Sequence, residues 1–552
     1  MRGMWGIDLA RGAILAFAMV NAALFSALLP LWEGFDEPFH YGYVEELWQA
    51  KRLPVFARTP LPYDVVASFQ LAPVSNVARR AIPEAIAYDA WFALPDAARE
   101  QRRRALEQLA ADSRVVTRGN YEAHQPPLAY LLLAPLDGAL ARLPLTVRVL
   151  VLRLFCGVGS VLLLFAGASA LCRALQVPEP FATAALFGIF CSEMFYATSA
   201  HVANDWLAIG VSAFLFAALA WFVKEPVGAP GRRTALAVGA WLAAGLLTKA
   251  YFLVFAVFAA SVAAALLVRR RVRIGTVLPG AARVVVLAGP WYARNFVLYG
   301  NIGGTPEAFD GIGIGQALAA AMRIDWPATA GYLARASLWT GNNWFNSYSR
   351  TTLNVLLAML ALAMVAWIWR RRAIRSAEWT VFAAVVLFLA AIAYEGCAMV
   401  ADRPGQTVAG PSPWYTQVLL APVMALAYLG LSSWKRVGRV LAGAMVTLWA
   451  WILGATWTLK LFPMYSGGGS SAMRARDVWN WWTHDAAAHA RTLSLTALAP
   501  AAWLYAGLAV ALALTVGVWA LQIRGLVREA SASRRPPNRG PRPAGRILPD
   551  ET

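Results

Sequence analysis

Apolar stretches of membrane-spanning length recur along this chain from residue 12 to residue 522. A bilayer core of about 30 Å needs roughly 20 apolar residues for each helix that crosses it. Hydrophobic residues make up 59% of the 552 residues and charged residues only 14%, which excludes an ordinary soluble globular protein. The sequence therefore predicts an all-α, polytopic integral membrane protein with about 12–14 transmembrane helices.

The candidate spans do not give a closed topology. They cover residues 12–32, 127–142, 149–170, 182–199, 205–223, 234–249, 250–268, 276–299, 351–369, 379–395, 414–431, 440–460 and 500–522. If the N-terminus and the loop at 269–273 are both cytoplasmic, an even number of crossings must separate them, but seven candidate spans do. We therefore expect one short segment, 127–142 or one half of 234–268, to be partial or re-entrant.

The formal charge of +19 comes mainly from short Lys and Arg clusters between the apolar spans rather than from one basic domain. This distribution follows the positive-inside rule and does not predict a nucleic-acid partner. The clusters lie at 224–233, 269–273, 370–375, 435–439 and 524–546. The opposite, outer loops are 33–126, 300–350, 396–413 and 461–499, and they hold most of the non-basic polar residues. This segregation predicts a multi-pass protein of the cell inner (plasma) membrane with an extracytoplasmic active site.

Two adjacent carboxylates and an imidazole, those of Asp36, Glu37 and His40, directly follow the first apolar stretch. Asp36 can cap a helix that has Pro38 in its first turn. His40 would then lie four residues farther on the same side of that helix. Because a carboxylate at the edge of a membrane cavity is costly unless compensated, we also expect a functional role for Asp36.

A second acid and imidazole, those of Glu122 and His124, stand just before Pro126 and Pro127, where the next apolar stretch begins. The prolines predict a helix start and an extended backbone before it. A lone histidine at an interface is commonly just hydrogen-bonded, but the nearby acid favours a role in the site.

Two cations stand at the outer ends of apolar stretches. Lys249 interrupts an apolar region and needs an anionic partner there. Arg294 precedes an outer loop, where binding a phosphate and reaching toward lipid headgroups are both open.

Three further candidates have simple structural alternatives. Asn204 and Asp205 can cap the helix that follows them. Arg403, next to Asp402, could line a sugar site in the loop at 396–413.

Taken together in their order along the chain, these motifs resemble the GT-C superfamily of membrane glycosyltransferases. The similarity is to the branch with the protein O-mannosyltransferases and the aminoarabinose transferases that modify lipid A. The residues that carry it are Phe35-Asp36-Glu37 with His40, His124-Gln125-Pro126-Pro127-Leu128-Ala129-Tyr130, Asn204-Asp205, Leu247-Thr248-Lys249, and Pro290-Trp291-Tyr292-Ala293-Arg294-Asn295 with Tyr299-Gly300. The resemblance covers about the first 300 residues, and Ala129 stands where many relatives carry an aromatic residue.

The resemblance implies a polyprenyl-phosphate-linked sugar donor, an acceptor hydroxyl arriving from the extracytoplasmic side, and inversion at the anomeric carbon. It implies that Asp36 is the general base, that Glu37 helps to position a substrate, and that Lys249 and Arg294 neutralise the departing phosphate. The remaining residues predicted to bind substrate are His40, Glu122, His124, Asn204, Asp205, Asn295 and Arg403.

The acceptor can be a glycan, a lipid or a protein, and membrane lipids surround the chain. We predict no required cofactor or metal, although Asp36, Glu37, His40, Glu122 and His124 offer a mixed oxygen and nitrogen ligand set for a divalent ion. The predicted organisation is a GT-C-type module over 1–300, an outer loop over 301–350, C-terminal helices over 351–522, and a disordered basic cytoplasmic tail over 523–552.

Two alternative functions remain open. A polysaccharide polymerase or ligase would favour arginine-rich outer loops. A transporter or flippase of a lipid-linked glycan predicts polar residues through the bilayer midplane and related halves. The apolar spans hold few charges and show no internal repeat, which favours the glycosyltransferase.

Overall fold

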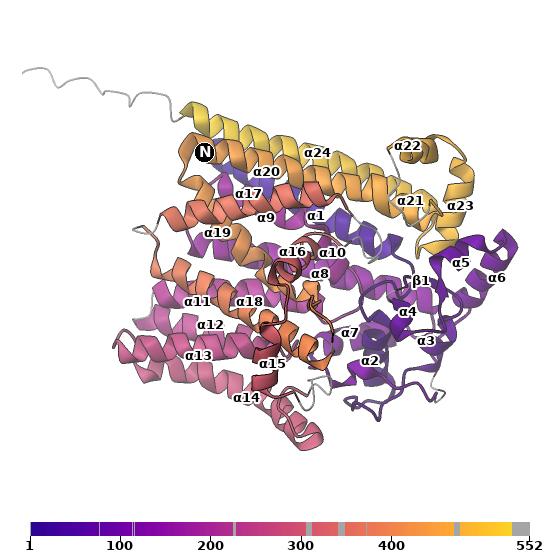
Figure 1. Ribbon diagram of the computed structural model, residues 1–552, viewed down its shortest axis with the longest axis horizontal. Helices are drawn as coiled ribbons and strands as arrows, with labels where there is room; N and C mark the ends of the chain where they lie inside the picture. Colours follow the sequence, from indigo (N-terminus) through magenta and orange to yellow (C-terminus); the bar gives the residue numbers. More distant parts are fainter. Residues whose placement is uncertain are drawn as a thin grey trace, which may run out of the picture.

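The computed structural model describes most of the chain as helices with short connections (Figure 1). It describes residues 2–76, 78–112, 114, 116–224, 228–304, 312–340, 348–370, 373–403, 405–468 and 475–532. Within these residues the strands are two residues long each, so the fold is all-α as predicted.

Nine helical segments of the described chain are long and apolar enough to cross a membrane. Six are single helices: α1 (Arg2–Leu28), α8 (Leu145–Ala174), α11 (Asp205–Lys224), α14 (Ile274–Tyr299), α17 (Arg350–Trp369) and α18 (Ser376–Asp402). A seventh, α24 (Ala501–Ala532), lies near the C-terminus. The other two join η2 (Pro413–Leu419) to α19 (Leu420–Ser432), and α20 (Lys435–Ala455) through the π-turn η3 (Thr456–Leu461) to α21 (Phe462–Tyr465). The chain is a multi-pass membrane protein.

Other predicted spans are broken or short. The segment predicted as one span over 182–199 is two helices, α9 (Phe181–Phe190) and α10 (Glu193–Ser199), bent by 55° at the break. The buried carboxylate of Glu193 starts α10 and accepts a hydrogen bond from the Thr340 backbone N–H, 2.8 Å away. A charged group inside an apolar region requires such a partner, and the partner comes from a distant loop.

The segments among which the topology predicts a partial span form α7 (Leu128–Ala139), α12 (Gly228–Leu246) and α13 (Phe252–Val268). Of these, α7 and α13 are shorter apolar helices, whereas α12 has 19 residues. At about 1.5 Å per residue, the 12 residues of α7 fall well short of a bilayer core.

The helices pack around one continuous apolar core that runs through most of the chain. In Figure 1, α24 and α20 run side by side along one edge, and α13 and α14 form the opposite edge. Between them α8 packs against both α1 and α11.

The first outer loop gathers at the end of the bundle opposite the N-terminus (Figure 1). It contains α2 (Glu37–Gln49), α3 (Tyr63–Ser68), β1 (Pro73–Val74), α4 (Ala78–Ala81), β2 (Ile86–Ala87), α5 (Tyr88–Ala93), α6 (Asp96–Glu107) and η1 (Tyr121–His124). The two strands pair in parallel, with Pro73 opposite Ile86 and Val74 opposite Ala87. The loop is therefore a folded unit on top of the helices.

The later outer segments also carry short helices: α15 (Ile314–Ala321), α16 (Trp326–Ala336), α22 (Ala475–Thr483) and α23 (Ala486–Thr496). Several predicted bounds differ from those of the helices. The helix α18 continues past residue 395 to Asp402, and α24 continues past 522 to Ala532. Residues 533–552 of the predicted tail lie outside the described residues.

Candidate active site

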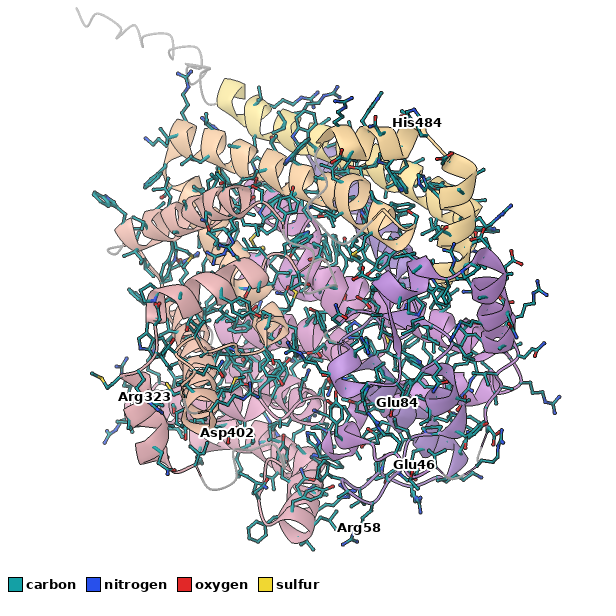
Figure 2. All side chains as sticks on the ribbon, turned by 45° about the vertical axis from the view of Figure 1, so that its right-hand side comes forward. Glu46, Arg58, Glu84, Arg323, Asp402 and His484 are labelled. Atoms are coloured by element: carbon teal, nitrogen blue, oxygen red, sulfur yellow. The ribbon has the colours of Figure 1, made fainter. Side chains whose placement is uncertain are left out.

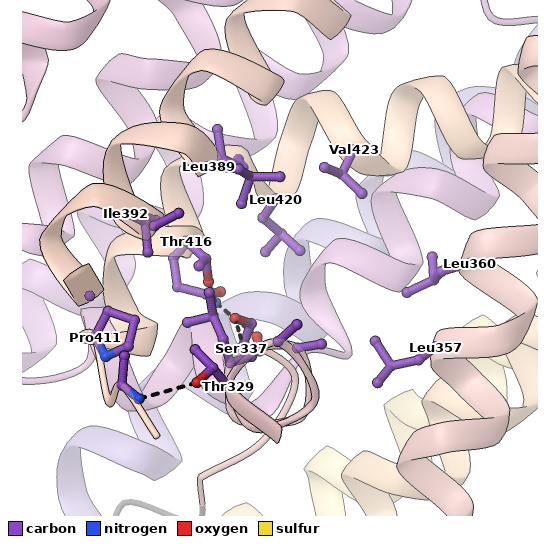
Figure 3. A pocket seen from close by; sticks show the side chains of 18 of the residues that line it. Thr329, Ser337, Leu357, Leu360, Leu389, Ile392, Pro411, Thr416, Leu420 and Val423 are labelled. Atoms are coloured by element: carbon purple, nitrogen blue, oxygen red, sulfur yellow. Dashed lines mark hydrogen bonds between the residues drawn. The ribbon is translucent and has the colours of Figure 1, made fainter. Parts of the chain in front are cut away.

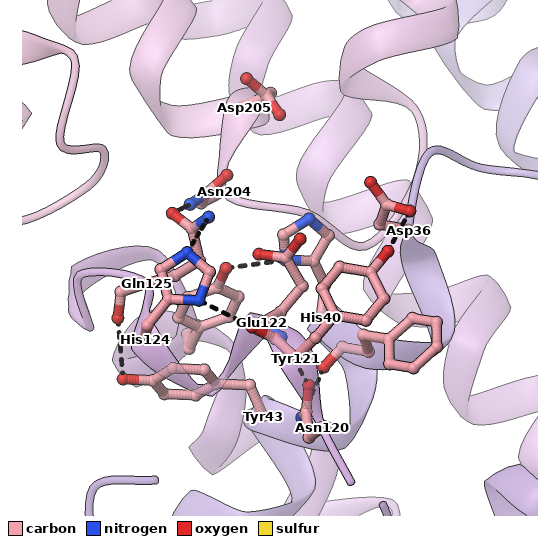
Figure 4. A network of polar contacts seen from close by, with 12 residues as sticks. Asp36, His40, Tyr43, Asn120, Tyr121, Glu122, His124, Gln125, Asn204 and Asp205 are labelled. Atoms are coloured by element: carbon pink, nitrogen blue, oxygen red, sulfur yellow. Dashed lines mark hydrogen bonds and ion pairs between the residues drawn. The ribbon is translucent and has the colours of Figure 1, made fainter. Parts of the chain in front are cut away.

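Asp36 lies at the start of α2, the first helix of the segment 33–126. Its backbone is left-handed, with φ 55° and ψ 18°, a conformation that Asp tolerates better than most residues. The predicted helix start is correct, but the predicted cap is not formed, because the side chain makes no capping hydrogen bond. Instead the carboxylate accepts a hydrogen bond from the Tyr121 hydroxyl (Figure 4).

A buried ion pair between Glu37, the residue after Asp36, and Arg153 of α8 stabilises the turn before Asp36. The Arg153 Nε donates to Glu37 Oε1 over 2.7 Å, and the same guanidinium donates to the carbonyls of Leu29 and Pro30 over 2.6 and 2.9 Å. The Val202 N–H also donates to Glu37, over 3.0 Å. Burial alone would raise the pKa of Glu37, but Arg153 holds it below its usual value. Glu37 is therefore ionised, and its ion pair holds this turn against α8.

Gly34 completes this turn by packing directly on His201. A Cβ at position 34 would lie 2.6 Å from the His201 Cβ, so no larger residue fits without a shift. The His201 ring also meets the Phe35 ring edge-on, with 5.8 Å between centroids. The backbone that presents Asp36 is therefore held from two sides.

Glu122 and Tyr121 reach the site from η1. This segment is a 3₁₀ turn rather than the predicted extended backbone, because the Asn120 side chain accepts a hydrogen bond from the Glu122 N–H over 3.0 Å. The backbone is extended only at Gln125, directly before the prolines. The ring of His124 contacts the Tyr121 carbonyl through Nδ1 at 2.7 Å.

His40 stands between the two acidic segments, as Figure 4 shows. Its Nδ1 is 2.7 Å from the Tyr130 hydroxyl and 3.9 Å from Glu122 Oε2. Burial, together with the positive charge of Lys249, lowers the pKa of His40 well below its usual value. The imidazole is therefore neutral at neutral pH and acts as a hydrogen-bonding group.

Lys249 has the anionic partner that its position requires. Its Nζ lies 2.5 Å from Asp205 Oδ2, and both side chains are nearly buried. Asp205 is the first residue of α11, but the Oδ1 atoms of Asn204 and Asp205 accept no hydrogen bond within the described residues, so the predicted side-chain cap is not formed. The Nζ also lies 5.1 Å from the centroid of the Tyr415 ring.

These groups border a polar cavity of about 550 Å³. Its lining residues are Phe35, Asp36, His40, Arg80, Ala81, Tyr121, Glu122, Gln125, Asp205, Lys249, Arg403, Ser412, Trp414 and Tyr415. Segments distant in sequence thus converge on one pocket, as expected if the two acidic motifs share a site. The substrate-binding roles of these residues remain predictions.

Five residues predicted for the site do not line this cavity: Glu37, His124, Asn204, Arg294 and Asn295. Asn204 donates to the Gln125 side chain and the Thr248 carbonyl, over 3.0 and 3.1 Å. Arg294 donates to the Pro54 carbonyl over 2.6 Å and lies over the Trp291 ring. Because these side chains are engaged elsewhere, the geometry gives them supporting positions around the cavity.

Two arginines that the sequence did not single out matter here. Arg80 lines the cavity from α4, and its only sequence signal, the pair Arg79-Arg80, is typical of a solvated surface. Arg153 lies fully buried inside an apolar span. A charge in such a span needs a partner, and this rule could have led to Glu37.

An apolar cavity of about 430 Å³ is also lined by the segment that carries Trp414 and Tyr415, and Figure 3 shows its walls. It is formed by α16, α17, α18, η2 and α19, with Leu357, Leu360, Leu389, Ile392, Leu420 and Val423 among its walls. Pro411, Thr416 and Gln417 line it, whereas Ser412, Trp414 and Tyr415 line the polar cavity. One short segment therefore separates an apolar space from a charged one.

Burial raises the pKa of Asp36 above its usual value, while the Tyr121 hydrogen bond and the charge of Lys249 act in the opposite direction. A carboxyl tuned in this way is a better proton acceptor once ionised. Among the described residues, no group of three or more His, Cys, Asp and Glu side chains is placed to hold a metal ion. The mixed ligand set considered from the sequence is therefore not assembled within the described residues.

The chain is similar along most of its length to solved structures of two other proteins. ArnT from Cupriavidus metallidurans bound to undecaprenyl phosphate matches with a TM-score of 0.45 and 14% identity, over 97% of this chain and 81% of that chain. Its apo state matches with a TM-score of 0.47 at the same identity, over 97% and 78%. The archaeal oligosaccharyltransferase AglB from Archaeoglobus fulgidus, in complex with an inhibitory peptide and a dolichol-phosphate, gives 0.39 and 14%, over 90% and 61%.

No protein-family model and no curated protein matches the chain.

Proposed function

We propose that this chain is an inverting membrane glycosyltransferase that moves a sugar from a polyprenyl-phosphate donor to an acceptor hydroxyl on the extracytoplasmic side. The observation that carries the proposal is the pair of cavities on the two sides of the segment 411–417. A lipid phosphate has an apolar chain and an anionic head. The apolar cavity suits the chain, and the charged cavity suits the phosphate and sugar.

The position of the site relative to the charge clusters supports the proposed side. The first outer loop lies at the end of the bundle opposite the N-terminus (Figure 1). The basic clusters, which mark the cytoplasm by the positive-inside rule, lie in the loops at 224–233, 269–273, 370–375 and 435–439 and in the C-terminal segment. The cavity would then open away from the cytosol, at the membrane surface where a lipid-linked donor is held.

Asp36 would act as the general base. One of its carboxylate oxygens takes the proton of the acceptor hydroxyl while the acceptor oxygen bonds to the anomeric carbon. The bond from that carbon to the phosphate oxygen breaks, and its electron pair leaves with the polyprenyl phosphate. Because the acceptor attacks opposite the leaving phosphate, the anomeric configuration inverts.

Cations would stabilise the departing phosphate. Lys249 and Arg403 border the cavity, and fixed charges in a water-poor site need no reorganisation when the leaving group gains charge. Glu37 acts through the backbone in this scheme, since its ion pair with Arg153 holds the turn that presents Asp36. In place of the predicted role in positioning a substrate, Glu37 then positions the backbone of Asp36.

The base can be tested directly with Asp36→Asn. The protein in membrane vesicles would be assayed with radiolabelled polyprenyl-phosphate sugars and an envelope extract as acceptor. We expect transfer to fall by about a hundredfold or more, because an amide cannot take the proton. Asp89→Asn, which changes an exposed acid away from the cavity, is the matched control. Transfer at the wild-type rate in Asp36→Asn would remove Asp36 from the mechanism.

The apolar cavity can be tested by filling it. Ala393 lines the cavity on α18, whereas Ala390 on the same helix is exposed and does not. We expect Ala393→Trp to raise the KM for the lipid donor by about tenfold, because the chain loses part of its apolar contact. Ala390→Trp should leave it unchanged. Equal donor KM values for the two variants would place the lipid chain elsewhere.

A further inference from the structure

Among the described residues, two guanidinium groups at the cavity have no hydrogen-bond or ion-pair partner, while the third cation has one. Lys249 is paired with Asp205. Arg80 and Arg403 both line the cavity, both are exposed, and within the described residues neither side chain forms a hydrogen bond or an ion pair. Unpaired guanidinium groups beside a cavity predict anionic groups on the molecules that enter it.

Arg80 is carried by a firmly held segment. The four-residue helix α4 lies between the paired strands β1 and β2, and Ile82 and Ala85 bury their side chains in the core. Arg118 donates to the Ala81 carbonyl and, over 2.7 Å, to Glu84. The segment is thus fixed without a hydrogen bond or ion pair from the Arg80 side chain to the described residues, which leaves its guanidinium available for a ligand.

The two unpaired arginines stand on different walls of the cavity. Arg403 follows the end of α18, close in sequence to Ala409 and Pro411, which line the apolar cavity. Arg80 comes from the first outer loop, and none of the residues of that loop lines the apolar cavity. Figure 2 labels Asp402, next to Arg403, and Glu84, in the loop that carries Arg80, and the two lie on different parts of the ribbon.

The wall with Arg403 therefore adjoins the proposed path of the lipid, and the wall with Arg80 does not. Asp36 and its partner Tyr121 belong to the same outer loop as Arg80. A base must face the acceptor hydroxyl, so the loop that supplies the base is the acceptor wall.

We infer that Arg80 binds an anionic oxygen group of the acceptor, a phosphate or a carboxylate close to the reacting hydroxyl. This inference rests on the proposed glycosyl transfer and adds a substrate class to it: an acidic acceptor. Arg80 is a specificity residue in this scheme, whereas Arg403 and Lys249 serve the donor phosphate.

The test compares Arg80→Gln with Arg79→Gln in the full-length protein in lipid nanodiscs. Arg79 is the adjacent exposed arginine on α4 and does not line the cavity. The acceptor is an envelope extract from cells that lack this protein, used in three forms: untreated, treated with phosphatase, and with its carboxylates converted to amides. The KM values for acceptor and donor are measured separately.

We expect Arg80→Gln to raise the acceptor KM by about tenfold with little change in the donor KM, because a charge-assisted hydrogen bond is lost. Arg79→Gln should match wild type. One of the two chemical treatments should raise the acceptor KM of the wild type as much as Arg80→Gln does. The same treatment should not raise the acceptor KM of Arg80→Gln further, and it thereby identifies the anion.

Three results would overturn the inference: equal acceptor KM values for Arg80→Gln and Arg79→Gln, an effect on the donor KM alone, or a wild-type enzyme indifferent to both treatments. In each case wild-type transfer would still stand. No wild-type transfer from any polyprenyl-phosphate sugar would instead reject the proposed function itself.

Discussion

The helix α2 has a polar cluster at each end, and the two differ in access. At its C-terminal half, Glu45 joins Asp64 and Asp137 around the single guanidinium of Arg148, and all four side chains are buried. Arg148 lies 2.7 Å from Asp137, 3.1 Å from Asp64 and 3.4 Å from Glu45. At the N-terminal end of the helix, Asp36 and its neighbours border the 550 Å³ cavity.

The residue types in the two clusters are nearly the same, so composition alone does not distinguish a structural cluster from one that can bind a substrate. The acids of the closed cluster surround a cation, and none of its members lines any of the cavities described here. In the open cluster, Asp36 accepts a hydrogen bond from the Tyr121 hydroxyl and lines the 550 Å³ cavity. The closed cluster holds α2, α3, α7 and α8 together, and this frame places the open one.

The largest effect should follow from removing the cation of the closed cluster. We expect Arg148→Gln to lower the free energy of unfolding by about 3–5 kcal/mol, because three buried carboxyls lose their counter-charge. Chemical unfolding in detergent would measure this. Arg142→Gln, an exposed change nearby, is the control, and Asp36→Asn should also keep wild-type stability. A stable Arg148→Gln would mean that the closed cluster does not hold the fold.

A smaller effect should appear in the pH dependence of stability. Burial raises the pKa of Asp64 from its ordinary 3.8 to about 6. A carboxyl with a raised folded-state pKa contributes stability below its ordinary pKa, and this contribution is lost as the pH rises through the folded value. Stability should therefore decline between about pH 4 and about pH 6.

Asp64→Asn should flatten that decline, since an amide does not titrate. Unfolding midpoints measured across this pH range would show it. If the variant and the wild type decline in parallel, the titration belongs to another member of the cluster, such as Glu45, whose pKa burial also raises.

The smallest effect should come from the open cluster and should appear in activity instead. The Tyr121 hydroxyl stabilises the ionised form of Asp36, which lowers the pKa of that carboxyl. In Tyr121→Phe the pKa of Asp36 should rise, so the acidic limb of the rate profile should move to higher pH. Steady-state rates over a pH series would measure the shift. An unmoved limb would mean that Asp36 does not set it.

The spans could be predicted from the sequence because a long apolar run is a local signal. The break between α9 and α10 could not, since the residues around it are apolar apart from Ser192 and Glu193, and a hydrogen-bond donor to that acid is the backbone of Thr340, far along the chain. The end of α24 was placed too early because its last turns, around Arg524 and Arg528, are charged but still helical.

The polar cavity was partly predictable for a similar reason. Asp36, His40 and Lys249 stand out as polar groups beside apolar runs, and all three line the cavity. The Glu37 anchor and the engagement of Arg294 with the Pro54 carbonyl depend on contacts between remote segments, which no local pattern encodes. Arg80 was missed because a free arginine on a short loop helix looks like any surface charge.

The arginine of α8 that bonds Glu37 also holds the carbonyls at the end of α1, so the turn that carries Asp36 is tied to two membrane helices at once. We expect the position of Asp36 to follow the helix bundle rather than the loop that surrounds the cavity.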